Sequence, residues 1–359
     1  MNNGEQDDCI AFLKLPLGDI KMPQTFMDQT LIRGVLLLLS TLVSAASLAP
    51  TPSEISSAIQ PLADFVSTKY ACAISIAVVM PHPKEAHTIR IASGGATVSD
   101  RFVWGSVTKT FTGGAILSLV ESGRLDLDAP VAPIIDRMLV REHGRHRTMN
   151  VTSLRQLWGD AVDAVTARQL ATMTSGVPDY DTAKPGNPPT DSFRAEVYSN
   201  PSRDYTPFDL ISVPWVATGS LLFPPGYKQH YSSTNFVLLG LLAAELSSSS
   251  SGGAQSWLDF DQGAFLPAAL RAKWGNSCTW AKTGSPAVVV SKEIGYDRTT
   301  YNGQPGTAPG IDDNDVHGVF AGWTASDWVA TPATTAEWGH ALYGSKTIVA
   351  ADLVKQMVP

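Results

Sequence analysis

The chain is poor in cysteine and in charged residues, and it carries fewer basic than acidic side chains. Its three cysteines in 359 residues, Cys9, Cys72 and Cys278, are too few for a disulfide framework. The formal net charge is −7 and no basic stripe runs along the chain, which argues against a nucleic-acid partner. Hydrophobic residues make up 44% of the chain, so it can bury the core of one large domain or of two intimate ones.

The histidines and cysteines do not form a metal-binding pattern. The densest basic segment, residues 141–147, contains His143 and His146, but nothing nearby in the sequence completes a site. We interpret this segment as a solvated loop and expect no metal. Cys72 and Cys278 could pair with each other or remain buried free thiols, and the sequence leaves both readings open.

An apolar run near the N-terminus has the layout of a signal peptide. Arg33 precedes the apolar residues 34–46, which are too few to span a bilayer comfortably and end in small side chains. We therefore expect a signal peptide within residues 27–49 that starts at Met27, and a secreted or extracytoplasmic protein. Residues 1–26 are then an N-terminal extension, interpreted as a gene-model artefact. Translation from the first methionine would instead favour a signal anchor, and with it a membrane-anchored protein.

The single Ser-x-x-Lys of the chain, Ser106 to Lys109, lies where a predicted strand runs into a predicted helix. Residues 101–104 are typical of a strand end, and Gly123 supplies a helix stop. The intervening apolar residues recur at helical spacing: Phe111, Ala115, Ile116, Leu119 and Val120. Since positions i and i+3 share a helix face, we expect the Lys109 amine to reach the Ser106 hydroxyl.

This pair predicts nucleophilic catalysis. A serine hydroxyl is a poor nucleophile at neutral pH, but a neighbouring lysine whose pKa falls by desolvation can take its proton as it attacks an acyl carbon. Ser106 would also lie at a helix N-terminus, where backbone N–H groups and the helix dipole stabilise a developing oxyanion.

The surrounding sequence resembles the serine β-lactamase and penicillin-binding-protein superfamily. Residues 104–131 resemble its nucleophile segment, above all in the class C-like branch with its family VIII carboxylesterases, D-aminopeptidases and D-alanyl-D-alanine carboxypeptidases. Three further segments resemble family patterns in the family's order. They are 166–180 (TxRxLLTHTSGLPDY), 223–240 (PPGxxFxYSNTNYxLLG) and 321–328 (AGGLxSTAxDL). The resemblance runs from about residue 55 to the last residue.

The family needs a tyrosine that shares protons with the serine–lysine pair and the leaving group, and two tyrosines compete for that role. Tyr198 spells the family's Y-S-N literally, but Pro201 follows it, and we interpret it as a surface loop aromatic. Tyr231 follows a Pro-Pro-Gly turn and precedes an apolar helical run, as in the family. We therefore predict Tyr231 as the acid/base and Ser233, where many relatives have an amide side chain, as a substrate-binding residue. A hydroxyl at that position favours ester over β-lactam or peptide turnover.

The third family motif, Lys-Thr-Gly or His-x-Gly on an edge strand, has no convincing match. Lys282 begins a literal Lys-Thr-Gly, but it precedes residues 321–327 instead of following them, and its neighbours do not suggest a strand. We interpret it as a loop, and neither His317 nor His340 offers the alternative motif. Only 32 residues follow Asp327, so we expect the third motif, its strand and the closing helix to be absent. The lost strand would have supplied the second oxyanion N–H.

The resemblance implies an α/β (α+β) fold, in which an antiparallel sheet flanked by helices carries an inserted, mainly helical subdomain. We expect a helix over residues 52–69 with a stripe of Ile55, Ile59, Leu62 and Phe65, and strands over 71–80 and 87–92. The expected domain is 50–359, with an α/β part at about 50–135 plus 318–359 and a helical subdomain at about 136–317.

The sequence predicts a secreted serine hydrolase that acts through an acyl-enzyme on a small ester, amide or peptide, without a cofactor. Ser106, Lys109 and Tyr231 are the expected catalytic residues. The alternative is a relative that keeps the fold as a non-catalytic binding or scaffold protein, or an inactive truncated relative. Covalent labelling of Ser106 separates the two.

Overall fold

The computed structural model describes residues 50–81, 86–143, 150–181, 193–248, 256–291 and 315–357. The predicted signal peptide, the N-terminal extension and His146 lie outside these residues. Within them, no helix is both long and apolar enough to cross a membrane.

The N-terminal elements form a layer of one helix and two strands: α2 (Pro52–Tyr70), β1 (Ile74–Met80) and β2 (His87–Ser93). The strands pair antiparallel, with Ile74 opposite Ser93 and Met80 opposite His87. Ile59 of α2 packs with Ile89 and Ile91 of β2 in a small apolar cluster. The predicted helix and strands are therefore confirmed. The predicted stripe is wrong at Phe65, which is exposed, because the buried face continues through Ala63 and Ser67.

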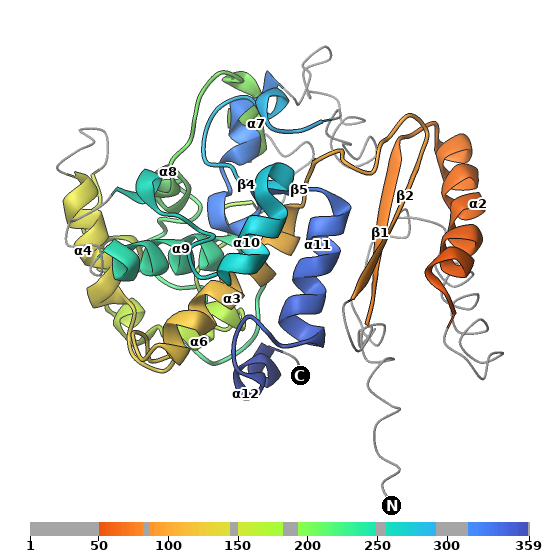
Figure 1. Cartoon of the computed structure of the whole chain (residues 1–359). Coiled ribbons are helices and arrows are strands. Elements are labelled where there is room, and N and C mark those ends of the chain that lie inside the picture. The colour runs from red at the N-terminus through yellow and green to blue at the C-terminus, as the bar shows by residue number, and fades with distance from the viewer. Residues whose placement is uncertain are drawn as a thin grey trace, which may run out of the picture. The chain divides into compact units, whose positions relative to one another are not determined.

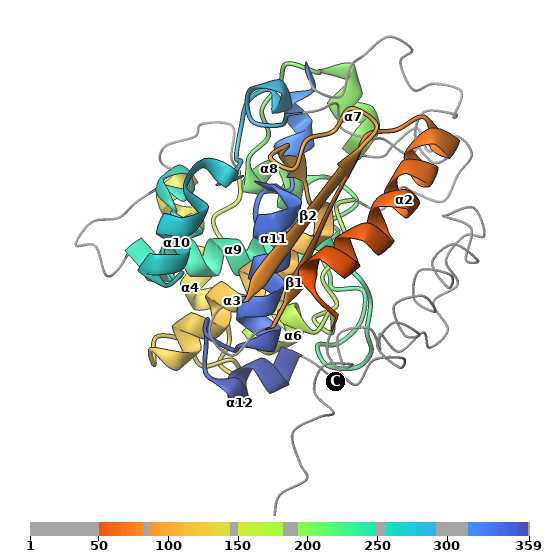
Figure 2. The ribbon, with the colours of Figure 1, turned by 45° about the vertical axis from the view of Figure 1, so that its right-hand side comes forward.

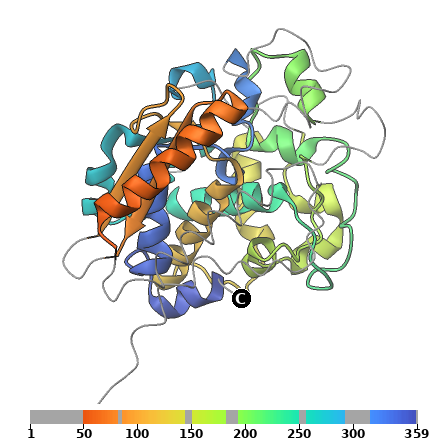
Figure 3. The ribbon, with the colours of Figure 1, turned by 90° about the vertical axis from the view of Figure 1, so that its right-hand side faces the viewer.

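Helix α11 (Pro332–Gly339) packs against β1 and β2, and α2 packs against the same two strands (Figure 1). Figures 2 and 3 show α2 running along the strands. The α11 contact is fixed by Glu337, a nearly buried carboxylate that accepts a hydrogen bond from the Thr88 hydroxyl at 2.8 Å and from the Trp274 indole at 3.1 Å. Arg90 and Lys273 balance its charge at 3.6 and 3.3 Å.

A second sheet leads to the nucleophile segment. It contains β3 (Phe102–Val103), β5 (Trp328–Ala330) and β4 (Cys278–Trp280) in the order β3-β5-β4, with antiparallel pairing throughout. The prediction of one antiparallel sheet is therefore wrong for the described residues, which form two sheets. The strands of the second have only two or three residues, too short for a sequence period. β4 also comes from the region that we expected to be helical.

The main apolar core lies between α3 (Thr108–Glu121), α9 (Ser233–Ser248) and α4 (Ala132–His143). α9 passes close to the 3₁₀ turn Trp323–Ala325. A Cβ at Gly240 would lie 2.1 Å from the Thr324 hydroxyl oxygen, so only glycine allows this approach. The two helices that begin at the candidate site residues are thus packed against each other and against the 321–328 segment.

The remaining helices are short: α5 (Leu154–Trp158), α6 (Ala167–Ala171), α7 (Phe193–Ser199), α8 (Pro207–Ser212), α10 (Ala268–Trp274) and α12 (Ala351–Val354). Both described cysteines are free; Cys72 is exposed, and burial raises the pKa of the Cys278 thiol to about 11. The domain boundaries remain predictions.

Candidate active site

Three predicted side chains meet at one hydroxyl group. The Lys109 Nζ lies 3.0 Å from the Ser106 Oγ, and the Tyr231 hydroxyl oxygen lies 2.7 Å from the same Oγ. Ser106 comes from the 3₁₀ turn Gly105–Val107, Lys109 from the first turn of α3, and Tyr231 from the loop before α9. The hydroxyl of Ser106 is thus in contact with two groups that can exchange protons with it.

Gly105 makes the turn from strand to helix that presents Ser106. Its φ of +51° is in the left-handed region, which a residue with a Cβ enters only at a cost of about 1–2 kcal/mol. No atom lies within 4 Å of where a Cβ would be, so the constraint at Gly105 is one of backbone conformation and not of space. Ser106, one residue later, is exposed.

Lys109 is held in place from several sides and is only 7% exposed. Its Nζ donates to the Ala325 carbonyl at 2.9 Å as well as to Ser106. The rings of Tyr231 and Phe236 lie 5.2 and 5.8 Å from the amine, within the range of cation–π attraction. The amine therefore has a fixed direction and two oxygen partners.

The segment that carries Ala325 is bound to both α3 and α9. Thr112 of α3 donates its hydroxyl to the Thr324 carbonyl at 2.7 Å, and the Thr324 hydroxyl donates to the Phe236 carbonyl at 2.8 Å. The Trp328 N–H donates to the Thr108 hydroxyl oxygen at 3.1 Å. These buried bonds fix the Ala325 carbonyl relative to the helix that carries Lys109.

The loop before Tyr231 lies on the segment that follows α6. The His230 N–H donates to the Met173 carbonyl at 2.8 Å, and the Met173 sulfur accepts from the Asn235 amide at 3.3 Å. Met173 has a φ of +61°, a left-handed conformation that costs a non-glycine residue about 1–3 kcal/mol. The contacts on either side of Tyr231 stabilise this conformation. The Ser232 hydroxyl adds a further bond on that side, which it donates to the Pro178 carbonyl at 3.2 Å.

Ser233, the predicted substrate-binding residue, begins α9 two residues after Tyr231. It is 5% exposed, and its N–H donates to the Asp179 carboxylate at 2.9 Å. Its backbone is thus part of the frame that holds the loop, and a role of its side chain in substrate binding remains a prediction. Asn235 completes the frame, since its amide oxygen accepts from the Ser175 hydroxyl at 2.7 Å.

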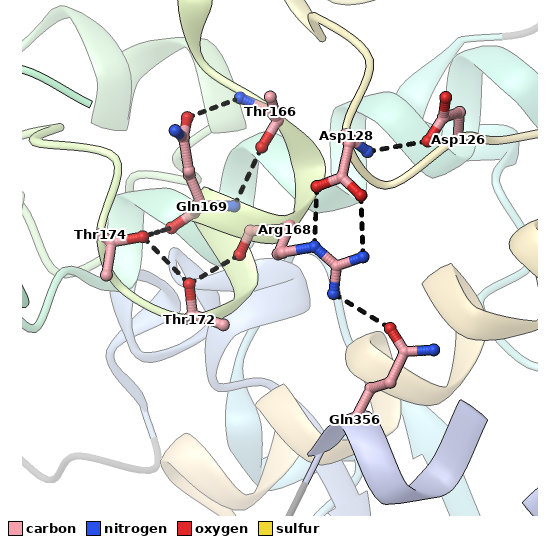
Figure 4. Close-up of polar contacts among 8 residues, drawn as sticks. All are labelled: Asp126, Asp128, Thr166, Arg168, Gln169, Thr172, Thr174 and Gln356. Atoms are coloured by element: carbon pink, nitrogen blue, oxygen red, sulfur yellow. Dashed lines mark hydrogen bonds and ion pairs between the residues drawn. The ribbon is translucent and has the colours of Figure 1, made fainter. Parts of the chain in front are cut away.

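Arg168 of α6 holds the helix that precedes the Met173 segment (Figure 4). Its guanidinium group donates to both oxygens of Asp128, at 2.7 and 2.9 Å, and to the Gln356 side chain at 3.0 Å. The bond from Arg168 lowers the pKa of the Asp128 carboxyl group. Figure 4 also shows the capping box of α6, in which Thr166 and Gln169 exchange hydrogen bonds. Arg168 thus links α6 to the loop that follows the nucleophile helix.

The structure places the alternative residues of the sequence in other elements. Tyr198 lies in α7, not in a loop as we expected. Lys282 lies in a loop, as we expected, two residues after the end of the strand β4 at Trp280. Its amine donates to the carbonyls of Leu258 and Phe260, the latter at 2.8 Å, and burial lowers its pKa. The part of the chain that the structure describes contains no cluster of three or more His, Cys, Asp or Glu residues that could hold a metal.

Sequence reasoning missed the groups that orient the predicted residues. The Ala325 carbonyl and the Met173 carbonyl are backbone atoms, so no residue type marks them. Both lie in segments that had been recognised by their family patterns, 321–328 and 166–180. The strand β5, which begins three residues after Ala325, marks this segment in the structure, but it is too short to be recognised in the sequence.

Two small antiparallel sheets with helices, and a serine, lysine and tyrosine in contact, are the features of the serine hydrolase class with a Ser-x-x-Lys nucleophile. The family model described as Beta-lactamase matches residues 84–358 of the chain. The chain therefore belongs to the Beta-lactamase family.

Solved structures with the same fold include a D-stereospecific amidohydrolase from Streptomyces sp. It is 22% identical with a TM-score of 0.57, and the match covers 84% of this chain and 77% of that one. The D-amino acid amidase from Ochrobactrum anthropi SV3, complexed with L-phenylalanine amide, is 19% identical with a TM-score of 0.54 over 83% and 72% of the chains. The same amidase with D-phenylalanine gives a TM-score of 0.52 at 19% identity over 83% and 73%.

Proposed function

We propose that this protein is a serine hydrolase that cleaves a small ester or amide through an acyl-enzyme on Ser106. The observation that carries the proposal is the position of the Ser106 Oγ, which lies within hydrogen-bonding distance of both the Lys109 amine and the Tyr231 hydroxyl. Such a nucleophile has a partner for the proton that it loses and a partner that can pass a proton to the leaving group.

The reaction has two steps. In the first, the Ser106 Oγ attacks the acyl carbon while its proton passes to the Lys109 amine, and the oxyanion accepts a hydrogen bond from the Ser106 N–H. The bond to the leaving alcohol or amine then breaks, and Tyr231 donates its proton to that group and recovers one from Lys109. In the second step a water molecule loses a proton to the same pair, attacks the ester carbonyl of the acyl-enzyme and releases the acid and the Ser106 hydroxyl.

The exposure of the cluster supports a substrate that approaches from solvent. Tyr231 is 52% exposed and Ser106 is exposed, whereas Lys109 beneath them is nearly buried. An acyl carbon can therefore reach the Ser106 Oγ without displacing the lysine. The structural neighbour that holds L-phenylalanine amide makes amino-acid amides the first substrates to test, together with short-chain esters. Ser233 is proposed to contact the substrate at the Tyr231 side.

We also propose that the protein is secreted. The support is the order of Arg33, the apolar residues 34–46 and the small residues at the end of that run. Expression from Met1 and from Met27 in a secreting host, followed by N-terminal sequencing of the protein in the medium, tests this. Cleavage near residue 45 is expected, and retention of the uncleaved segment in the membrane fraction would support an anchored form instead.

A fluorophosphonate probe and a panel of esters and amino-acid amides test the enzymatic function. Wild type should react with the probe and turn over at least one class of substrate, and Ser106→Ala should do neither. Ser122→Ala is the matched control, because Ser122 follows the same helix and donates to the Ser118 carbonyl. A wild-type protein that neither reacts with the probe nor hydrolyses any substrate would support a non-catalytic binding protein.

A further inference from the structure

The turn that carries the Ala325 carbonyl is closed by a carboxyl group. Asp327 is 1% exposed; one of its carboxyl oxygens accepts from the Trp323 N–H and the other from the Ser326 hydroxyl. The turn between these residues contains Ala325, whose carbonyl accepts from the Lys109 amine at 2.9 Å. A single buried side chain thus joins the two ends of the peptide segment that orients the lysine.

The turn is held in a conformation that needs such a closure. Trp323 has a φ of +47°, the left-handed region that is costly for a bulky side chain. A Cβ at Gly322 would lie 1.8 Å from the Ser326 Oγ and 2.7 Å from the Tyr180 hydroxyl oxygen, so glycine is required there. The side-chain bonds of Asp327 hold Trp323 and Ser326 together against this strain, in addition to the backbone bonds from the Ser326 and Asp327 N–H groups to the Trp323 carbonyl at 3.3 and 3.0 Å.

We infer that Asp327 is a positioning residue for Lys109: by closing the 322–327 turn it aims the Ala325 carbonyl at the lysine amine and so directs the amine toward Ser106. The inference rests on the proposed function of Lys109 as the base.

The direction of the amine decides whether it can act as a base. A neutral amine has two N–H donors and one lone pair. When one N–H points to the Ala325 carbonyl, the lone pair can turn to the hydroxyl hydrogen of Ser106, 3.0 Å away. Without that carbonyl, the four-carbon stem of Lys109 leaves the amine free to rotate away. A misplacement of about 1 Å at a reacting group can cost about 10²-fold in rate.

Charged and titratable groups surround Asp327 on several sides. Burial raises the pKa of Asp327 well above its ordinary value, while its hydrogen bonds to Ser326 and Trp323 act in the opposite direction. Tyr180 bonds Ser326 from the other side, and burial, together with Asp181, Asp327 and Asp179, raises its pKa well above the usual value. Because protonated Asp327 can still bond both partners, with its O–H donating to Ser326, both of its charge states close the turn.

Variants that keep or lose the two hydrogen bonds of Asp327 distinguish the positioning of Lys109 from a purely structural role. Asp327→Asn keeps an acceptor for the Trp323 N–H and can donate its amide to Ser326, whereas Asp327→Leu keeps the volume and loses both bonds. We expect Asp327→Leu to lower kcat, and the rate of fluorophosphonate labelling of Ser106, by about 10²-fold. KM should stay within about threefold, because the turn lies beneath Lys109, away from the exposed side. Asp327→Asn should recover most of that loss.

Glu337→Gln is the matched control. Glu337 is another nearly buried carboxylate, but it joins α11 to β2 and α10 instead of the site. The Glu337→Gln variant should have a lower melting temperature than wild type, and Ser106 of the folded variant should be labelled at the wild-type rate. If Asp327→Leu does not fold, Ser326→Ala, which removes one of the two bonds, should lower labelling about tenfold.

The outcomes separate this inference from the proposed function. A wild-type protein that is not labelled on Ser106 at any pH contradicts the proposed function. If wild type is labelled and the folded variants, Asp327→Leu or Ser326→Ala, react at the wild-type rate, only the role of Asp327 is overturned. Equal losses of kcat in Asp327→Leu and Asp327→Asn also overturn it, because the bonds would then not be what matters.

Discussion

Replacement of Tyr231 by phenylalanine should separate catalysis from stability. The change removes one oxygen, which lies 2.7 Å from the Ser106 Oγ, and leaves the ring beside Lys109 in place. A positioned acid/base usually contributes about 10²-fold or more, which corresponds to about 2.7 kcal/mol of transition-state stabilisation. The side chain is 52% exposed, so the loss of this hydroxyl should lower the free energy of unfolding by less than about 1 kcal/mol.

The assay compares steady-state turnover of the best ester or amide with chemical denaturation of the same samples. We expect kcat to fall by about 10²-fold or more while the denaturation midpoint stays close to that of wild type. Tyr227→Phe is the control, because Tyr227 lies in the same loop and is 75% exposed. If Tyr231→Phe raises KM at unchanged kcat, Tyr231 binds substrate and does not transfer protons, and the proposed mechanism is wrong.

Three further changes test other parts of the site. Lys282→Ala should leave turnover nearly unchanged and lower the free energy of unfolding by about 1 kcal/mol, because the Lys282 amine donates to backbone carbonyls and not to the catalytic cluster. A large loss of turnover would mean that Lys282 belongs to the third family motif after all. Gly105→Ala and Gly95→Ala both force a Cβ into a left-handed conformation and should each destabilise by about 1 kcal/mol, but only Gly105→Ala should also lower kcat, because it displaces Ser106. Because burial raises the pKa of Asp327, the folded protein keeps a proton that the unfolded chain has released, so the free energy of unfolding should decline as pH rises from about 3.8 through the folded pKa. Urea titrations across that range should show a smaller decline in Asp327→Asn.

The sequence was sufficient to predict the side chains of the cluster. Ser106 lies in the 3₁₀ turn that leads into α3 and Lys109 lies three residues later in the first turn of α3, so their contact follows from local geometry. Tyr231 is 125 residues away from Ser106, and no periodicity could have placed it there. It was chosen over Tyr198 because of its place between a Pro-Pro-Gly turn and a helix, and the structure confirms both that turn, with Gly226 at a φ of +83°, and the helix α9.

The sheet and the supporting contacts could not be predicted in the same way. β3, β4 and β5 are too short to alternate, and their pairing joins residues 102–103, 278–280 and 328–330. The left-handed residues Met173 and Trp323 carry no sequence signal either, because their conformations are imposed by tertiary contacts. The exposed Phe65 shows the same limit, since an apolar residue on a helix is buried only where another element covers it.

The most direct test of the account is peptide mapping after the protein is mixed with its best substrate and quenched in acid. The account predicts a mass increase equal to the acyl group on the peptide that contains Ser106, absent in Ser106→Ala and slower to form in Lys109→Met. An acyl group on any other residue, with Ser106→Ala still fully active, would contradict it.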